Sequence, residues 1–215
     1  MKGNCGLIQE KFKVVNLLQK KRRQPDPRVV RTRNMLKCAL LELIGEKGYD
    51  SIRVQDIARR ATLNRATFYL HYRDKDDLLN QSIEDILNEL IRGMKNKRLS
   101  EEKITDRDGN VVKPLPDLVY VFEHVANNES FYTVMLGPHG EQRLLFRLLE
   151  VFTDTLSERL SHTHLKPTVP KEILVHYAAS AYLGVIVWWL KNGQPYSPEY
   201  MATQLTRLRL QHMNF

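Results

Sequence analysis

The sequence predicts an all-α protein, in which a small N-terminal module of three helices precedes a larger helical C-terminal body. Apolar residues recur at three- and four-residue spacing along most of the chain, and no run of alternating strands appears. The charge predicts the division into two parts. Residues 1–75 hold 18 Lys and Arg against 7 Asp and Glu, whereas residues 76–215 hold 15 against 18.

The charge and composition also exclude several classes of protein. A net charge of +11 on residues 1–75, ahead of a mildly acidic remainder, indicates that the N-terminal part meets a polyanion. The longest stretch free of charged and strongly polar groups, Ala178–Leu190, is shorter than the roughly 18–20 apolar residues of a membrane helix. Cys5 and Cys38 form no CxxC pair, and no signal-peptide pattern follows Lys2. We therefore expect a cytoplasmic protein with no membrane partner.

Residues 1–25 are a basic N-terminal extension. Apolar residues recur there at helical spacing (Ile8, Phe12, Val15 and Leu18), and residues 20–23 are all Lys or Arg. One interpretation is an arm or short helix that follows DNA, and the other is a frayed segment that adds only unspecific charge. Deleting residues 2–23 separates the two, because unchanged DNA affinity would exclude the arm.

The first helix of the module is expected over residues 27–47. Asp26 can accept a hydrogen bond from an unpaired amide of the first turn, and Pro27 suits the first helical position. Gly48 follows where a left-handed residue commonly ends a helix. The apolar positions form one stripe: Leu36, Ala39, Leu40, Leu43 and Ile44.

Two short helices, 54–61 and 65–72, are joined by only three residues, which predicts a helix-turn-helix at about 54–73. Asn64 is the natural N-cap of the second of them, and Asp74 can cap a long helix over 75–97. We therefore divide the first half of the chain into a DNA-binding domain, 26–75, and a connecting helix, 76–98.

Residues 99–114 are expected to be an exposed loop, because 105–110 are turn-forming; Ile104, Val111 and Val112 could pair as a small hairpin. Residues 115–215 form the C-terminal domain. Its expected helices, separated by Gly and Pro, are 118–128, 130–136, 141–161, 170–192 and 198–212.

The helix at 65–72 carries the side chains suited to DNA. If it enters the major groove, Arg65 and Thr67 in its first turn face base edges or phosphates. Tyr69 and His71 offer donors for phosphates, and Gln55 and Lys75 begin the flanking helices, where amide dipoles favour an anion. The residues expected to hold the module together are Ile57, Leu63, Phe68 and Tyr72.

Residues 31–79, above all the segment from Val54 to Leu79 with Ala61-Thr-Leu-Asn-Arg65-Ala-Thr67-Phe-Tyr69-Leu-His71-Tyr72, resemble the TetR family of bacterial transcriptional regulators. The resemblance implies a homodimer that binds a palindromic double-stranded DNA operator, each subunit placing its third helix in a major groove. Carried over residue by residue, it puts DNA contacts on Gln55, Asn64, Arg65, Thr67, Tyr69, His71 and Lys75.

The chain departs from the family pattern at two positions. Arg53 stands where the family usually has Ser or Thr before the second helix, which loses a cap but adds a cation. Thr62 stands where the turn usually carries Gly, although Thr is poorly suited to a left-handed conformation. If that backbone is left-handed, Thr62→Gly is predicted to raise stability by about 0.5–1 kcal/mol.

The C-terminal domain, through residues 118–132 and 181–199, resembles that of a Gram-positive TetR subgroup. This subgroup includes a regulator of dihydroxyacetone kinase genes that acts as an activator with a partner protein. Helix 170–192 is apolar nearly all round and must be covered. The family implies that 170–192 and 198–212 form a four-helix dimer interface, with candidates Tyr177, Ala181, Gly184, Trp188, Leu205 and Leu208.

A ligand pocket in the C-terminal domain has only aromatic candidates, which are equally readable as ordinary core residues. They are Phe122, Phe131, Tyr132, Phe146, Phe152, Tyr177 and Trp189. His162 and His164 have no Cys or carboxylate neighbour and are interpreted as surface residues, so no metal site and no cofactor are expected.

The expected function is therefore that of a ligand-responsive repressor that binds operator DNA as a homodimer. The alternative is a partner-dependent activator or co-regulator that works through a partner protein and has no small-molecule effector. An enzyme is not expected, because the chain has no Gly-rich phosphate loop, no GxSxG turn and no HExxH helix.

Overall fold

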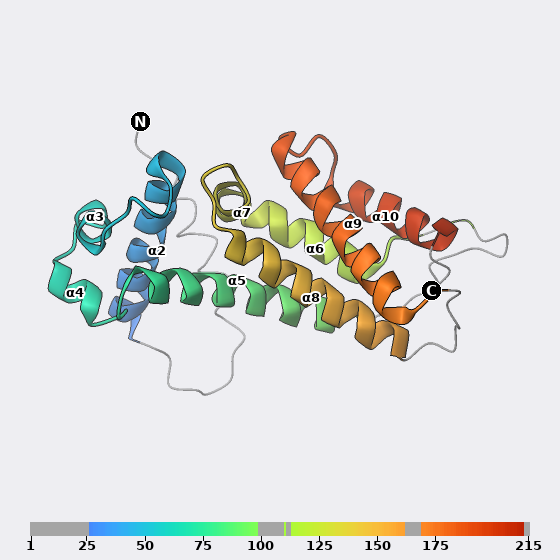
Figure 1. Ribbon diagram of the computed structural model, residues 1–215, viewed down its shortest axis with the longest axis horizontal. Helices are drawn as coiled ribbons and strands as arrows, with labels where there is room; N and C mark the ends of the chain where they lie inside the picture. Colours follow the sequence, from blue (N-terminus) through green and yellow to red (C-terminus); the bar gives the residue numbers. More distant parts are fainter. Residues whose placement is uncertain (1–25, 99–109, 111–112, 162–168, 213–215) are drawn as a thin grey trace.

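The computed structural model describes residues 26–98, 110, 113–161 and 169–212, and all of its regular elements there are α-helices (Figure 1). The extension 1–25, the hairpin expected around Ile104 and Val111, and the pair His162 and His164 lie outside the described residues. The helices are α2 (Pro27–Lys47), α3 (Val54–Arg60), α4 (Arg65–Tyr69), α5 (Lys75–Arg98), α6 (Pro116–Asn127), α7 (Glu129–Met135), α8 (Gln142–Ser161), α9 (Lys171–Lys191) and α10 (Pro198–His212).

The long helix α5 connects two groups of helices. Helices α2, α3 and α4 gather around its N-terminal end (Figure 1). Helices α6 and α8 pack along the rest of it, and α7, α9 and α10 pack against these helices to complete a bundle. The all-α prediction is confirmed, and the helices lie within a few residues of their predicted bounds. The largest difference is α4, which ends at Tyr69 and not at Tyr72.

The ends of α2 form as the sequence predicts. The Asp26 side chain accepts a hydrogen bond from the backbone N–H of Arg28 at 2.8 Å, and Pro27 occupies the first turn. At the other end Gly48 has a φ of 74°, and its N–H donates to the carbonyl of Ile44. A positive φ explains why glycine follows this helix.

Thr62 adopts the left-handed conformation in the turn between α3 and α4, with a φ of 58°. The turn is closed by two backbone hydrogen bonds, from the N–H of Thr62 to Arg59 at 3.1 Å and from Leu63 to Ala58 at 2.8 Å. These bonds require a left-handed residue, so the backbone condition for the Thr62→Gly prediction is met.

One continuous apolar core runs from the small module into the bundle. In the module the fully buried side chains include Leu36, Ile57 and Phe68, which join α2, α3 and α4. In the bundle Phe122 and Trp189 are both fully buried, and their rings meet edge to face at 5.2 Å. Because the two parts share one packed core, a movement of helices in the bundle is transmitted through side-chain contacts to the module.

Polar contacts at the junction join α5 to α8. Arg143 donates from Nη2 to the Asp76 carboxylate at 2.7 Å, and its guanidinium lies 5.4 Å from the centre of the Tyr49 ring. Arg147 binds Glu84, about two turns further along α5, at 2.7 Å. The Arg143 hydrogen bond lowers the pKa of Asp76, so this carboxylate is ionised at neutral pH.

Helix α9 is apolar on most of its surface and half of its apolar stretch is buried in the protein. Among the described helices it is the one that passes a length and composition test for a membrane span. A core helix of a soluble protein passes the same test, and here α9 packs along α8.

Candidate nucleic-acid interface

Helix α4 buries one side and exposes the other. Phe68 is fully buried, while Tyr69 and Leu70 are 47% and 81% exposed. Arg65, four residues before Tyr69 and on the same face, is exposed too. Its Nη2 donates to the Tyr69 hydroxyl at 3.2 Å, and its guanidinium lies 5.5 Å from the centre of the ring. The outer face of α4 thus presents a cation and a phenol held together.

Asn64 begins α4 as predicted. Its side-chain oxygen accepts the backbone N–H of Ala66 at 3.0 Å, in an N-cap. The oxygen therefore serves the helix, and only the amide NH₂ of Asn64 is suited to contacting DNA as a donor.

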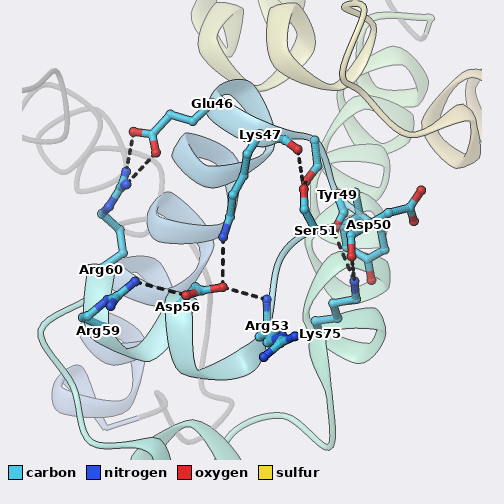
Figure 2. Close-up of polar contacts among 11 residues, drawn as sticks. Glu46, Lys47, Tyr49, Asp50, Ser51, Arg53, Asp56, Arg59, Arg60 and Lys75 are labelled. Carbon is cyan, nitrogen blue, oxygen red and sulfur yellow. Dashed lines mark hydrogen bonds and ion pairs between the residues drawn. The ribbon is translucent and has the colours of Figure 1, made fainter.

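Helix α3 is joined to α2 by a set of polar contacts centred on Asp56 (Figure 2). Its carboxylate accepts hydrogen bonds from Lys47 Nζ at 2.9 Å, from the backbone N–H of Arg53 at 3.1 Å, and from Arg59 Nη2 at 3.1 Å. The Lys47 contact, followed by the Arg53 amide, lowers the pKa of Asp56. The cap that Arg53 cannot supply with its own side chain is thus partly replaced by Asp56.

A second contact joins the C-terminal end of α3 to the C-terminal part of α2. The Arg60 guanidinium binds Glu46 through two hydrogen bonds, at 2.8 and 2.6 Å (Figure 2). It also donates to Glu42 at 3.1 Å. Bidentate geometry fixes orientation as well as distance. Both contacts set the angle of α3, and therefore of α4 after it, relative to α2.

Lys75, predicted to contact DNA, is turned toward the protein (Figure 2). Its Nζ donates to the backbone carbonyls of Tyr49 at 3.1 Å and Asp50 at 3.3 Å, and it lies 4.3 Å from the centre of the Tyr49 ring. In this structure Lys75 holds the connection between α2 and α3 and does not face outward.

The other predicted contact residues lie around α4. Gln55 is exposed in the first turn of α3, whereas Thr67 and His71 are half-buried. The sequence analysis missed Leu70 and Arg73, although the Arg73 side chain is 87% exposed. A signal for both was present: Phe68 and Tyr72 are four residues apart and both buried, so positions between and after them lie on the outer side.

The aromatic residues proposed for a pocket do not all come together. Phe122, Phe131, Tyr132, Phe152 and Trp189 are buried, but Phe146 and Tyr177 are 57% and 63% exposed and cannot line an internal pocket. The expectation is therefore wrong for these two. Phe146 lies between the buried positions Leu144 and Leu148 of α8, on the opposite side of the helix.

The residues proposed for a dimer interface are exposed, with a single exception. Tyr177, Ala181, Gly184 and Trp188 of α9 and Leu208 of α10 are exposed. Leu205 is only 3% exposed and packs inside the protomer, so its assignment to a contact surface is wrong. The spacing of 205 and 208 does not reveal this, because both are Leu on one short helix.

His124 of α6 is a buried histidine for which the sequence shows no partner. Its Nδ1 lies 3.9 Å from Oε1 of Glu89, and its Nε2 has no hydrogen-bond partner among the described residues. Burial lowers the pKa of His124 to about 4, and burial also raises the pKa of Glu89. The imidazole is therefore neutral at neutral pH.

Two family models match this chain. One, described as "Bacterial regulatory proteins, tetR family", matches residues 39–81, and the other, a "Transcriptional regulator C-terminal region", matches residues 112–211. The first covers α3, α4 and the parts of α2 and α5 that flank them. The second covers the whole helical bundle beyond α5.

Two curated relatives are similar in sequence. An uncharacterized HTH-type transcriptional regulator, YxbF of Bacillus subtilis, is 27% identical over 191 residues, which are 86% of this chain and 46% of YxbF. The negative transcriptional regulator IcaR of the biofilm operon of Staphylococcus epidermidis is 33% identical over 51 residues, 24% of this chain and 28% of IcaR. The matched part of this chain spans slightly less than half the length of YxbF and less than a third of the length of IcaR.

Two solved structures share the fold at low identity. The regulator FadR from Bacillus subtilis, in complex with stearoyl-CoA, is 18% identical with a TM-score of 0.58, over 81% of this chain and 95% of that one. The dihydroxyacetone kinase operon activator DhaS is 18% identical with a TM-score of 0.56, over 86% and 97%. At this identity the likeness establishes the fold alone.

Proposed function

Because the chain belongs to the TetR family of bacterial regulatory proteins, we propose that it binds a palindromic DNA operator as a homodimer and thereby regulates transcription. The family consists of transcriptional regulators and not of enzymes. The observation that carries the proposal is the outer face of α4, where Arg65 and Tyr69 stand exposed as a pair.

The proposed contacts divide by chemistry. Arg65 is the candidate for reading a base, because a guanidinium can bind guanine through two hydrogen bonds. Tyr69, Gln55 and the amide of Asn64 are candidates for phosphates, and the exposed Leu70 for a thymine methyl group. Thr67 and His71 remain proposed contacts, while Lys75 contributes by holding the α2–α3 connection.

The test is binding of the purified protein to its own upstream intergenic DNA across a salt series. Arg65→Ala and Tyr69→Ala are expected to weaken binding to one specific fragment, and Arg65→Ala to lose discrimination of about 1–3 kcal/mol at one base pair. Arg92→Ala is the matched control, because it removes the same charge from an exposed position on α5. Sequence-blind binding that survives both changes on α4 would exclude specific recognition.

We place the dimer interface on the exposed face of α9 and α10. Large exposed apolar side chains that gather on one helix face mark interaction sites, and on α9 Tyr177 and Trp188 are 63% and 46% exposed. Gly184 lies between them, and a side chain added there would meet no atom of the protomer within 4 Å. Gly184→Arg should therefore give a folded monomer in sedimentation, with Gly184→Ala remaining a dimer. A dimer that persists in Gly184→Arg contradicts the assignment.

We further propose that a small molecule bound in the helical bundle releases the repressor from DNA. The support is indirect: IcaR is named a negative regulator, and the structure of FadR holds stearoyl-CoA. A ligand that prefers a conformation in which the two α4 helices are wrongly spaced for the operator would shift the population away from the DNA-bound form. The site of action would be the cytoplasm, where the DNA is.

The alternative, a partner-dependent activator without an effector, rests on the likeness of fold to the activator DhaS. A thermal-shift screen separates the two, because a ligand that binds the folded state raises the unfolding midpoint. A platform without an effector would be stabilised by protein or DNA only.

A further inference from the structure

A small internal cavity lies in the bundle where five helices meet. Its wall is built of apolar side chains from α5, α6, α8 and α10, among them Met94, Phe122, Phe152, Leu156 and Leu205. The cavity measures about 20 Å³, which is room for about one water molecule. Of the aromatic residues that the sequence singled out for a pocket, only Phe122 and Phe152 line it.

Besides Thr155, whose hydroxyl donates to the carbonyl of Val151 at 2.7 Å, three polar side chains reach this apolar cavity. Asp117 of α6 and Arg159 of α8 form an ion pair there, with side chains only 5% and 11% exposed. Tyr182 of α9 is 5% exposed and lines the same cavity.

Each of the three keeps one polar atom without a hydrogen-bond partner among the described residues. These atoms are Oδ1 of Asp117, Nε of Arg159 and the hydroxyl of Tyr182. Buried polar groups are almost always paired, so three unpaired ones around one cavity require an explanation. Apolar pockets with a few convergent polar groups are the usual form of small-molecule sites.

The unpaired atoms define what would complement them. Oδ1 of Asp117 is an acceptor and needs a donor, whereas Nε of Arg159 is a donor and needs an acceptor. Burial raises the pKa of Tyr182, so its hydroxyl stays protonated and offers both functions. A ligand group that both donates and accepts hydrogen bonds has the functions that these three atoms lack.

The charges beside the cavity further restrict the class of ligand that it can bind. Asp117 and Arg159 already neutralise each other, so a ligand carboxylate would face the Asp117 carboxylate, and a ligand ammonium would face Arg159. The charge of Arg209 also acts on the Tyr182 hydroxyl and adds to the cost of a ligand cation. A ligand anion would gain from Arg209 but would still face the unpaired Oδ1 of the Asp117 carboxylate. A further charge placed beside a compensated buried pair also loses its hydration without a partner.

We propose that this cavity is the polar end of the effector site, and that the effector is an uncharged molecule with an apolar body and a group that both donates and accepts hydrogen bonds, such as an amide or an alcohol. The inference rests on the proposed function. A ligand larger than water must displace side chains, and Met94 is the most adaptable of them. Met94 belongs to α5, which also carries Asp76 at the junction with the DNA-binding module.

The test uses the full chain with three six-carbon probes that differ in charge: hexanamide, hexanoate and hexylamine. Hexanamide is expected to raise the unfolding midpoint and release operator DNA at a concentration at least tenfold below that of the two charged probes. Equal action of all three, or stronger action of hexanoate, would overturn the proposed ligand class.

Tyr182→Phe locates the site, because it retains the ring and removes only the hydroxyl. It should raise the midpoint of the ligand-free protein, since an unpaired buried hydroxyl is removed, and weaken the hexanamide response about tenfold. Tyr72→Phe is the matched control: it removes another buried, unpaired hydroxyl, from the DNA-binding module, and should leave the response unchanged. A full response in Tyr182→Phe would exclude the cavity.

The two levels of proposal fail separately. A wild-type protein that binds operator DNA but responds to no probe overturns the effector assignment alone. A wild-type protein that binds no specific DNA without any probe overturns the proposed function.

Discussion

Replacing Thr62 by glycine should stabilise the protein, although it removes a side chain. Thr62 has a φ of 58°, and the left-handed region costs an L-residue roughly 1–2 kcal/mol relative to the right-handed one. Its side chain is exposed, so little packing is lost with it. Glycine avoids that strain but loses more backbone freedom on folding, by roughly 0.5–1 kcal/mol.

The difference leaves a net gain of about 0.5–1 kcal/mol. For a chain of this size that gain raises the melting temperature by about 1–4 °C, measurable by differential scanning calorimetry. Thr62→Asn is the graded control, since Asn tolerates the left-handed region better than Thr and should fall between the two. Gln194 is a second test of the same reasoning, because its φ is 56°.

A lower melting temperature in Thr62→Gly would refute the strain argument. Operator binding should be measured alongside, because the turn lies beside α4. A loss of affinity together with higher stability would show that the Thr62 side chain itself contacts DNA, and would leave the stability argument intact.

Three further predictions follow from buried groups. Arg159→Met should destabilise the protein by about 3–5 kcal/mol in urea unfolding at pH 7, because the Asp117 carboxylate stays buried without its partner; adding Asp117→Asn should restore part of the loss, and a mild effect would contradict the buried pair. His124 has a pKa of about 4 in the folded protein, below its value in the unfolded chain. The free energy of unfolding that depends on neutral His124 is therefore fully present above about pH 6.5 and falls toward pH 4, by about 3 kcal/mol at most. His124→Gln should flatten this part of the pH profile of stability, and an unchanged slope would show that other groups cause it. Gly93→Ala should destabilise by about 1–3 kcal/mol against the usual helix preference, because the new Cβ would lie 1.8 Å from Cζ of Tyr120; chemical denaturation of this variant with Tyr120→Leu added should show recovery, and its absence would argue for another cause.

Local features of the chain were predictable because their causes are local. Asp26, Pro27 and Gly48 set the ends of α2 through their own hydrogen bonds and φ angles. The three-residue spacing between the two short helices predicted the helix-turn-helix, and the strained residue in its turn was identified as Thr62. The outward position of Arg65 and Tyr69 follows from helical periodicity once Phe68 is assigned to the core.

Properties that depend on distant residues were decided only by the tertiary structure. The sequence shows that Phe146 and Tyr177 are large aromatic residues on helices. It does not show that the neighbouring helices leave both side chains exposed. The sequence predicts Lys75 as a phosphate contact but could not show that its Nζ donates to the carbonyls of Tyr49 and Asp50, 26 and 25 residues away.

The cavity lined by Asp117, Arg159 and Tyr182 is the clearest example of a feature that only the tertiary structure decided. Asp117, Arg159 and Tyr182 lie on three helices, and the two partners of the ion pair are 42 residues apart in the chain. Nothing in the residues around each of them indicates a partner, because a buried ion pair is created when separate helices pack together and exclude water. The sequence by itself determined the helices and the outward face of α4, whereas the packing of the bundle decided which side chains share a cavity.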